Sequence, residues 1–287
     1  MSKLNEIKNV RHSRIKERLA FYLLCVFSIL TIIVLALIVS DILVKGLPHI
    51  SFNFLLEEPR KMGKAGGIFS VIVSTFYIVV LSVVFAAPIG IAASVYLTEY
   101  AKEGPVLRII RYGIEALAGV PSIIYGLFGY SFFVVFLGLK YSILSGALTL
   151  TLMILPTIVR TSEEAIKAVP SSYREGSLAL GATKLQTIRK IVIPTAMPGI
   201  LTGLILGIGR VVGESAAVIY TAGSSLGVPD SILRPGRTLS VHLFTLASEG
   251  LSAENTYATA VVLITLVLII NFIANTLINK IFIARRR

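Results

Sequence analysis

The chain has 287 residues, 55% of them hydrophobic and 15% charged, and its formal net charge at pH 7 is +12. A soluble domain of this length is far more polar, so the composition excludes an ordinary soluble enzyme or binding module. The basic residues flank apolar runs instead of forming a soluble basic face, which excludes a nucleic-acid-binding protein.

Six apolar stretches are each long enough to cross a bilayer as a helix, for which about 20 residues suffice. We therefore expect an all-α, polytopic membrane protein with six transmembrane helices. The spans are predicted at residues 20–44, 68–97, 112–137, 143–168, 196–222 and 257–283. Most of the 27 lysines and arginines lie on the side of the spans that also holds both chain ends. By the positive-inside rule, the N- and C-termini are cytoplasmic.

The chain begins with a basic cytoplasmic tail at residues 1–18, followed at 19–67 by the first span and an external loop. This apolar stretch is too long for a signal peptide, and no small-residue cleavage site follows it, so we expect an uncleaved helix. Cys25 is the only cysteine, and the three histidines are far apart in sequence. Neither a disulfide within the chain nor a metal site is predicted.

The third predicted span contains Glu115, which precedes the segment Gly119-Val120-Pro121-Ser122. Two positions are open for this glutamate. It could be a charged group inside the membrane, which would suggest a function, or it could lie near the cytoplasmic end of the helix. The second position is favoured because only a few residues separate Glu115 from Arg111.

A polar stretch between the fourth and fifth spans has a readable local structure. Ser172 and Glu175 have the spacing of a capping box, which begins a helix. Gly181 is the residue type that ends a helix in the left-handed conformation. Thr183 and Gln186 have the spacing of a second capping box. The sequence therefore predicts a pair of short helices at the cytoplasmic surface.

Two functions are open for this pair of helices. Apolar residues recur at three and seven positions after Leu185, so the pair could be an amphipathic element that only anchors the loop to lipid. The alternative is a docking surface for another protein. The order of Glu175, Gly181 and Ile191-Val192-Ile193-Pro194 favours docking, although Glu175 alone could be no more than a helix cap.

The fifth span combines small residues with two charges. Gly199, Gly203 and Gly207 recur every four residues, which predicts that another helix packs closely against this face. Arg210 and Glu214 continue the same face. A charge inside a bilayer costs on the order of 3 kcal/mol, so both are predicted to point into protein or into a water-filled path.

Two roles are open for Arg210 and Glu214. They are one helical turn apart, so the pair could neutralise itself and pin two helices together. The functional alternative is that Arg210 meets an anion in transit, because its planar fork matches phosphate oxygens and keeps its charge. Glu214 would then hold Arg210 when no anion is bound, or accept a hydrogen bond from a protonated phosphate. No GxxxxGK[ST] loop occurs, so no ATP hydrolysis and no catalytic residue are predicted.

Together with the loop at residues 170–194, three motifs resemble the PstA family, the permeases of phosphate ABC importers. These motifs are Gly119-Val120-Pro121-Ser122-Ile123-Ile124-Tyr125-Gly126, Leu155-Pro156-Thr157-Ile158-Val159-Arg160-Thr161-Ser162-Glu163-Glu164-Ala165 and Gly207-Ile208-Gly209-Arg210-Val211-Val212-Gly213-Glu214. The resemblance implies the type I ABC importer permease (MetI-like) fold over residues 68–287. The sequence departs from the family where Gly176-Ser177 replaces Ala-Ala, which is expected to loosen the first helix of the loop, and where Ile193 replaces a leucine.

The resemblance implies a permease subunit of an ATP-driven importer of inorganic phosphate in a prokaryotic inner or plasma membrane. It implies a heterodimer with a PstC-like permease, a PstB-like ATPase dimer that uses ATP and Mg²⁺, and an external PstS-like phosphate-binding protein. No cofactor is expected on this chain, and Arg210 with Glu214 would lie on the substrate path. The residues that would couple the chain to the ATPase are Glu175, Gly181, Ala182 and Thr183.

Two other functions are open. One is a permease of the same architecture that carries another oxyanion, such as sulfate or molybdate. The other is a transporter or channel that needs no ATPase; this class would predict inverted repeats, which are not evident in the sequence.

Overall fold

The structure is a computed structural model that describes the backbone of residues 2–286 and the side chains of residues 21–273, 275 and 276. Its helices are α1 (Ser2–Gly46), α2 (Phe52–Leu56), α3 (Phe69–Val95), α4 (Pro105–Ala118), α5 (Ser122–Gly129), α6 (Ile143–Lys167), α7 (Ser171–Ala179), α8 (Lys184–Thr187), α9 (Ile193–Val212), α10 (Ala216–Thr221), α11 (Leu239–Ser248) and α12 (Ala253–Arg286). Short 3₁₀ turns are η1 (Leu47–His49) and η2 (Lys61–Gly63), and π-helical turns are η3 (Tyr96–Tyr100), η4 (Tyr130–Phe136) and η5 (Ile188–Val192). The strands β1 (Pro59–Arg60) and β2 (Ala65–Gly66) form an antiparallel ribbon.

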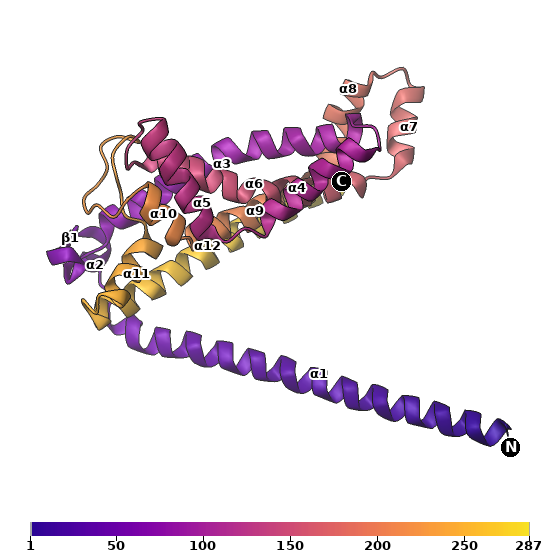
Figure 1. Cartoon of the computed structure of the whole chain (residues 1–287), viewed down its shortest axis with the longest axis horizontal. Helices are drawn as coiled ribbons and strands as arrows, with labels where there is room; N and C mark the ends of the chain where they lie inside the picture. Colours follow the sequence, from indigo (N-terminus) through magenta and orange to yellow (C-terminus); the bar gives the residue numbers. More distant parts are fainter. Residues whose placement is uncertain (1, 287) are drawn as a thin grey trace.

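Within the described residues, five helices are long and apolar enough to cross a membrane, and a bent pair of helices makes a sixth span if it is counted as one. The five spans are Phe21–His49, Phe69–Tyr100, Ile143–Lys167, Lys184–Val212 and Ala253–Ile273. Both chain ends lie at the same end of the bundle as α7 and α8, whereas α11 and the ribbon lie at the opposite end (Figure 1). With the basic segments inside, α7 and α8 are therefore cytoplasmic, and the all-α, multi-span prediction is confirmed.

The third predicted span, residues 112–137, is wrong as a straight helix. The helical stretches Pro105–Ala118 and Ser122–Phe136 meet at an angle of 99°. Pro121 explains the break, because proline lacks the N–H that a helix requires and disfavours the helical conformation of the residue before it.

The fifth predicted span, residues 196–222, is wrong at both ends. α9 ends at Val212, and a break separates it from the short helix α10. On the inner side, α8, η5 and α9 are consecutive parts of one span, Lys184–Val212. The second of the two predicted surface helices is therefore the beginning of a membrane helix and not a short separate one.

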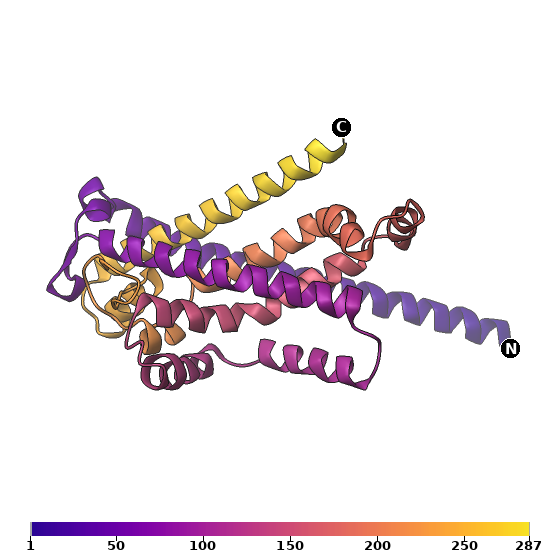
Figure 2. The same ribbon diagram turned by 90° about the horizontal axis from the view of Figure 1, so that it is seen from above.

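The central helix of the bundle is α6, which packs against α3 and α9. Ile154 and Ile158 of α6 are fully buried, and they belong to one apolar core together with Ile78 of α3 and Val211 of α9. In the view from above, α4 and α12 lie on opposite sides of the molecule, with α3 and α6 between them (Figure 2).

The glycine stripe of α9 lies at the contact with α6. A Cβ added at Gly199 would come within 2.5 Å of the Ala165 Cβ, and one added at Gly203 would come within 1.9 Å of the Thr161 Oγ1. Gly207 is less crowded, because its nearest neighbours would be 3.6 Å away. At the two inner positions only glycine allows the backbones to approach this closely.

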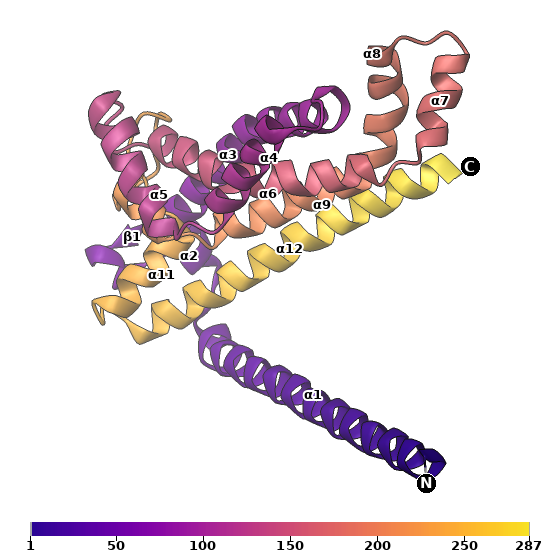
Figure 3. The ribbon, with the colours of Figure 1, turned by 45° about the vertical axis from the view of Figure 1, so that its right-hand side comes forward.

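Helix α1 leaves the bundle at its outer end and runs away from it (Figures 1 and 3). None of the apolar window of its span is buried inside the molecule. At the outer end, the Lys45 Nζ lies 2.7 Å from an Asp41 carboxylate oxygen and 5.1 Å from the centre of the Tyr257 ring of α12. The apolar sides of α1 therefore face lipid or another protein along most of their length.

The outer end of the bundle carries a buried pair of basic residues. Arg237 and His242 are 4% and 1% exposed. The Arg237 guanidinium donates two hydrogen bonds to the Ser224 carbonyl, at 3.1 and 2.9 Å, and its Nη1 lies 3.4 Å from the His242 Nδ1. Burial and the neighbouring Arg237 cation lower the pKa of His242 to about 4. His242 is therefore neutral at physiological pH.

Candidate functional site

The inner hairpin, residues 170–187, projects beyond the bundle at the cytoplasmic end (Figure 3). Its first helix begins at Ser171 directly after Pro170, which makes no side-chain cap. The predicted Ser172–Glu175 capping box is wrong, because the helix begins before Ser172, which therefore lies within its first turn. Glu175 is exposed to solvent and forms no ion pair with the side chains that the structure describes.

The turn of the inner hairpin matches the prediction. Gly181 has φ = +82°, the left-handed conformation that ends the first helix. Thr183 and Gln186 form the predicted capping box: the Thr183 N–H donates to Gln186 Oε1 at 2.9 Å, and the Gln186 N–H donates to Thr183 Oγ1 at 3.3 Å. Ala182, between Gly181 and Thr183 in the turn, is half-buried, and its N–H donates to the Ser177 carbonyl at 3.2 Å.

The two arms of the inner hairpin are joined by a hydroxyl pair. The Ser177 Oγ and the Thr187 Oγ1 are 2.9 Å apart and buried. Ser177 supplies a contact that an alanine cannot make. That Gly176-Ser177 loosens the first helix of the loop stays a prediction.

The tip of the inner hairpin presents apolar side chains to solvent. Leu180 is 90% exposed and Leu185 is 65% exposed. Ile188 and Val192, three and seven positions after Leu185, are buried. The second arm is thus held by its continuation through η5 into α9. The two exposed leucines lie beyond the bundle, on either side of the protruding turn. This arrangement favours docking of another protein over anchoring to lipid.

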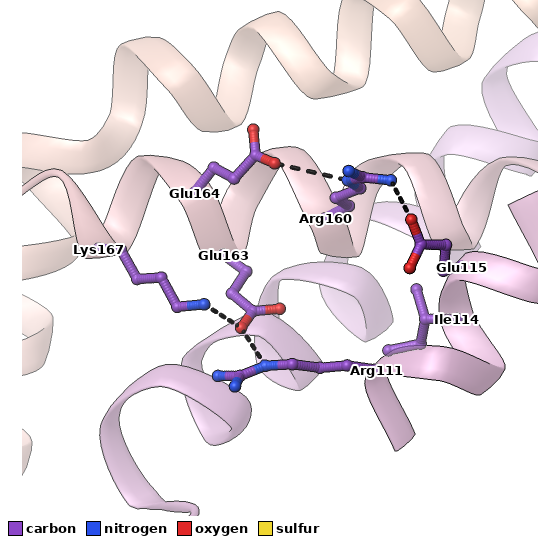
Figure 4. Close-up of a pocket in the computed structure, with 7 residues that line it drawn as sticks. All are labelled: Arg111, Ile114, Glu115, Arg160, Glu163, Glu164 and Lys167. Atoms are coloured by element: carbon purple, nitrogen blue, oxygen red, sulfur yellow. Dashed lines mark hydrogen bonds and ion pairs between the residues drawn. The ribbon is translucent and has the colours of Figure 1, made fainter. Parts of the chain in front are cut away.

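A cluster of charged side chains that the sequence analysis did not assemble lies between α4 and α6 (Figure 4). Glu163 is bound by two cations through its Oε1, at 2.8 Å from Arg111 Nε and 2.7 Å from Lys167 Nζ. Arg160 bridges two carboxylates, at 3.4 Å from Glu115 and 3.5 Å from Glu164. These side chains surround a pocket of about 200 Å³.

Glu115 pairs with Arg160 of α6, seven residues before the inner end of that helix. Its position near the cytoplasmic surface stays a prediction. The pocket contains three cations and three carboxylates, whose charges cancel. Two of the ion pairs cross from α4 to α6. The cluster holds α4, which precedes the bend at Pro121, against the central helix. A sequence signal existed in the basic and acidic residues of 160–167, but their partners on α4 are about 50 positions away and could not be paired without the fold.

Arg210 and Glu214 are not an ion pair. α9 ends at Val212, so Glu214 lies beyond the helix, and its Oε1 accepts a hydrogen bond from the Ala217 N–H at 3.1 Å. This hydrogen bond pairs a backbone N–H in the first turn of α10. The predicted spacing of one helical turn fails because the helix does not continue past Gly213.

Arg210 is half-buried in the last turn of α9. Among the described side chains it has no carboxylate within ion-pair distance, and it interacts electrostatically with Tyr125 of α5. The hydroxyl of Tyr125 is occupied, since it donates to the Leu117 carbonyl at 2.8 Å. Arg210 thus carries an uncompensated positive charge at the junction of α9 and α5. Its role on a substrate path stays a prediction, as does that of Glu214.

The chain resembles known transport proteins over most of its length. Residues 86–286 match the model of the family described as binding-protein-dependent transport system inner membrane component. The chain is 37% identical over 241 residues to the probable ABC transporter permease protein YqgI of Bacillus subtilis, covering 78% of this chain and 82% of that protein. It is 34% identical over 247 residues to phosphate transport system permease protein PstA 2 of Mycobacterium bovis, covering 85% of this chain and 80% of the relative.

Solved structures of ABC transporters share the fold. A chain of the bacterial alginate ABC transporter, in complex with its pentasaccharide-bound periplasmic protein, superposes with a TM-score of 0.68, 15% identity and coverage of 93% of this chain and 96% of that one. A chain of the inward-facing MetNI methionine ABC transporter gives 0.61, 22% identity and coverage of 72% and 93%. At these identities the likeness establishes the MetI-like fold and leaves the substrate open.

Proposed function

Because the chain belongs to the family of binding-protein-dependent transport system inner membrane components, we propose that it is the permease subunit of an ATP-driven importer of inorganic phosphate. The observation that carries the coupling part of this proposal is the inner hairpin, which extends into the cytoplasm with exposed leucines at its tip. The naming of relatives such as PstA 2 as phosphate transport permeases supports the substrate.

A separate ATPase is the partner that the inner hairpin fits. The chain contains no phosphate loop of the GxxxxGK[ST] type, so ATP and Mg²⁺ would be bound by a PstB-like ATPase dimer. Leu180 and Leu185 supply an apolar contact, and Glu175 supplies an exposed carboxylate for a basic group on that partner. Gly181, Ala182 and Thr183 would set the shape of the turn between the arms.

A second permease and a binding protein complete the proposed complex. The apolar surface of α1, which diverges from the bundle beyond its contact with α12 at the outer end, supports packing against a PstC-like permease as a heterodimer. A PstS-like phosphate-binding protein would dock at the outer end, where α11 and the loop before it lie. The pathway would run between the two permeases, so one chain presents only one of its walls.

Arg210 is the group on this wall that we propose meets phosphate. It is an uncompensated guanidinium, and a guanidinium can bind two oxygens of a phosphate through parallel N–H bonds. Glu214 lies four residues on, and its second oxygen would accept a hydrogen bond from a protonated phosphate. Movement of the inner hairpin, driven by closure of the ATPase dimer, would switch the path between its two openings.

The proposal is tested with the complex of both permeases, the ATPase and the binding protein reconstituted in proteoliposomes. Uptake of labelled phosphate should require ATP, and a tenfold excess of sulfate or molybdate should leave it unchanged. Arg210→Ala should abolish uptake, while Arg210→Lys should retain part of it. Uptake without ATP would refute the ATPase-coupled function. Full competition by sulfate or molybdate would assign the permease to another oxyanion.

A further inference from the structure

Helix α7, the arm of the inner hairpin that carries Glu175, also contacts the cytoplasmic end of α3. Arg174 precedes Glu175 and points the other way, into the protein. Its Nε and Nη2 donate to the Oε1 of Glu99, at 3.0 and 2.8 Å. Glu99 lies in η3, the π-helical turn that ends α3, and its side chain is only 9% exposed. The ion pair is thus largely shielded from solvent, where screening by water and salt is weak.

The same guanidinium binds the end of α6. Its Nη1 donates to the Val169 carbonyl at 2.7 Å, and its Nη2 donates to the Ile166 carbonyl at 2.9 Å. These carbonyls belong to the end of α6 and the residues that follow, where a helix leaves acceptors without partners and favours a cation. One side chain on α7 therefore joins the inner ends of two other helices, α3 and α6.

The other arm of the inner hairpin contacts α3 at the adjacent residue. Lys184, at the start of α8, places its Nζ 4.8 Å from the centre of the Tyr100 ring, a cation–π contact. Both arms therefore hold the same turn of α3, one through Glu99 and one through Tyr100. This is a second contact, independent of the first, between the same two parts of the chain.

The contacts of Arg174 with Glu99 and of Lys184 with Tyr100 together form a clasp on the inner end of α3. From this clasp, α3 reaches to the opposite side of the membrane. It packs along α6, where Ile158 fills the space beside Gly90. At its outer end the Thr75 Oγ1 accepts a hydrogen bond from the Leu239 N–H, at the start of α11, at 2.9 Å. A displacement of the inner end of α3 would therefore be passed as a rigid-body movement to the outer helix α11.

We propose that Arg174 is a positioning residue that transmits movement of the inner hairpin to α3, and through α3 to the outer end of the permease. The inference rests on the proposed function, because it takes the ATPase to be the source of the movement. Glu175 faces outward and Arg174 inward on consecutive positions of one helix. Movement of the ATPase would act on the hairpin at Glu175, and Arg174 would pass that movement on to α3.

The first test measures phosphate imported per ATP hydrolysed by the reconstituted complex. Arg174→Gln and Glu99→Gln should each lower this ratio about fivefold or more, while ATP hydrolysis stays within about twofold of the wild type. The double variant should be no worse than Arg174→Gln, because both changes break one interaction. Arg108→Gln, which removes an exposed cation at the same inner surface, should have no effect. A wild-type ratio in both single variants would overturn the proposal.

A second measurement does not depend on the identity of the transported ion. Spin labels at the exposed positions Ala179 and Lys102, in a Cys25→Ser chain, report the distance between the end of α7 in the inner hairpin and the end of α3. In the wild-type complex this distance should stay constant when the ATPase is trapped closed with vanadate, and in Arg174→Gln it should change. A change in the wild type, or constancy in both, would refute the clasp. Should the wild-type complex import no phosphate, the proposed function fails, and the distance still decides the clasp.

Discussion

The contact between α9 and α6 predicts a large effect from a very small substitution. In Gly203→Ala, the new Cβ would lie 1.9 Å from the Thr161 Oγ1 and 2.9 Å from its Cβ. Thr161 cannot easily move, because its hydroxyl donates to the Thr157 carbonyl at 2.8 Å. The helices must therefore separate, and overpacking of this kind costs about 1 to 3 kcal/mol. For a protein of this size, that corresponds to a melting temperature lower by about 2 to 12 °C.

The matched control is Gly209→Ala in the same helix, where an added Cβ would meet nothing within 4 Å. Because alanine favours helix over glycine, this variant should be as stable as the wild type or slightly more so. The assay follows the loss of the monodisperse peak in size-exclusion chromatography after heating in detergent. Equal melting temperatures for Gly203→Ala and Gly209→Ala would refute the close packing of α9 on α6.

Three further predictions concern the outer end and the inner hairpin. The pKa of His242 is lowered in the folded state to about 4, so stability should be full above pH 6.5 and fall by about 3 kcal/mol as the pH drops from 6.5 to about 4. Heating scans across this range should show the fall in the wild type and a much smaller one in His242→Gln. Ser177→Ala leaves the buried Thr187 hydroxyl without its partner, at a cost of about 1 to 3 kcal/mol, and should speed hydrogen exchange in α7 but not in α11. Leu180→Asp places a charge on the 90% exposed tip and should weaken pull-down of the ATPase, whereas the same change at exposed Leu233 on the outer side should not.

Sequence patterns with a short range predicted the elements well. Four of the spans and the left-handed Gly181 depend on the residues at hand and their immediate neighbours, and so does the Thr183–Gln186 capping box. The predicted Ser172–Glu175 box failed although its spacing was correct. Pro170 directly before Ser171 already begins the helix, so no side chain was needed at that point.

Predictions that assumed an unbroken helix failed. The bend before Ser122 occurs at Pro121, and the break after Val212 occurs at Gly213. Both residues are visible in the sequence, but a hydropathy value averaged over a window of residues does not register them. The break at Gly213 also undid the expected pairing of Arg210 with Glu214. Charged residues that are four positions apart therefore lie on one face only where the helix between them is unbroken.

Contacts between distant parts of the chain could not be predicted from the sequence. Arg174 and Glu99 are 75 positions apart, and Arg111 and Glu163 are 52 apart. Each of these residues occurs in a mixed polar stretch with several possible partners. Only the arrangement of α3, α4 and α6 at the inner end decides which carboxylate meets which guanidinium.

The central claim is that the inner hairpin is where a separate ATPase acts on this permease. It is tested most directly by a photo-reactive amino acid at position 180, which replaces the exposed leucine at the tip, with the outer position 233 as control. In membranes containing the whole complex, the label at 180 should cross-link to the ATPase subunit and the label at 233 should not. Cross-linking of the label at 180 to lipid alone, with an ATPase present and active, would contradict the account.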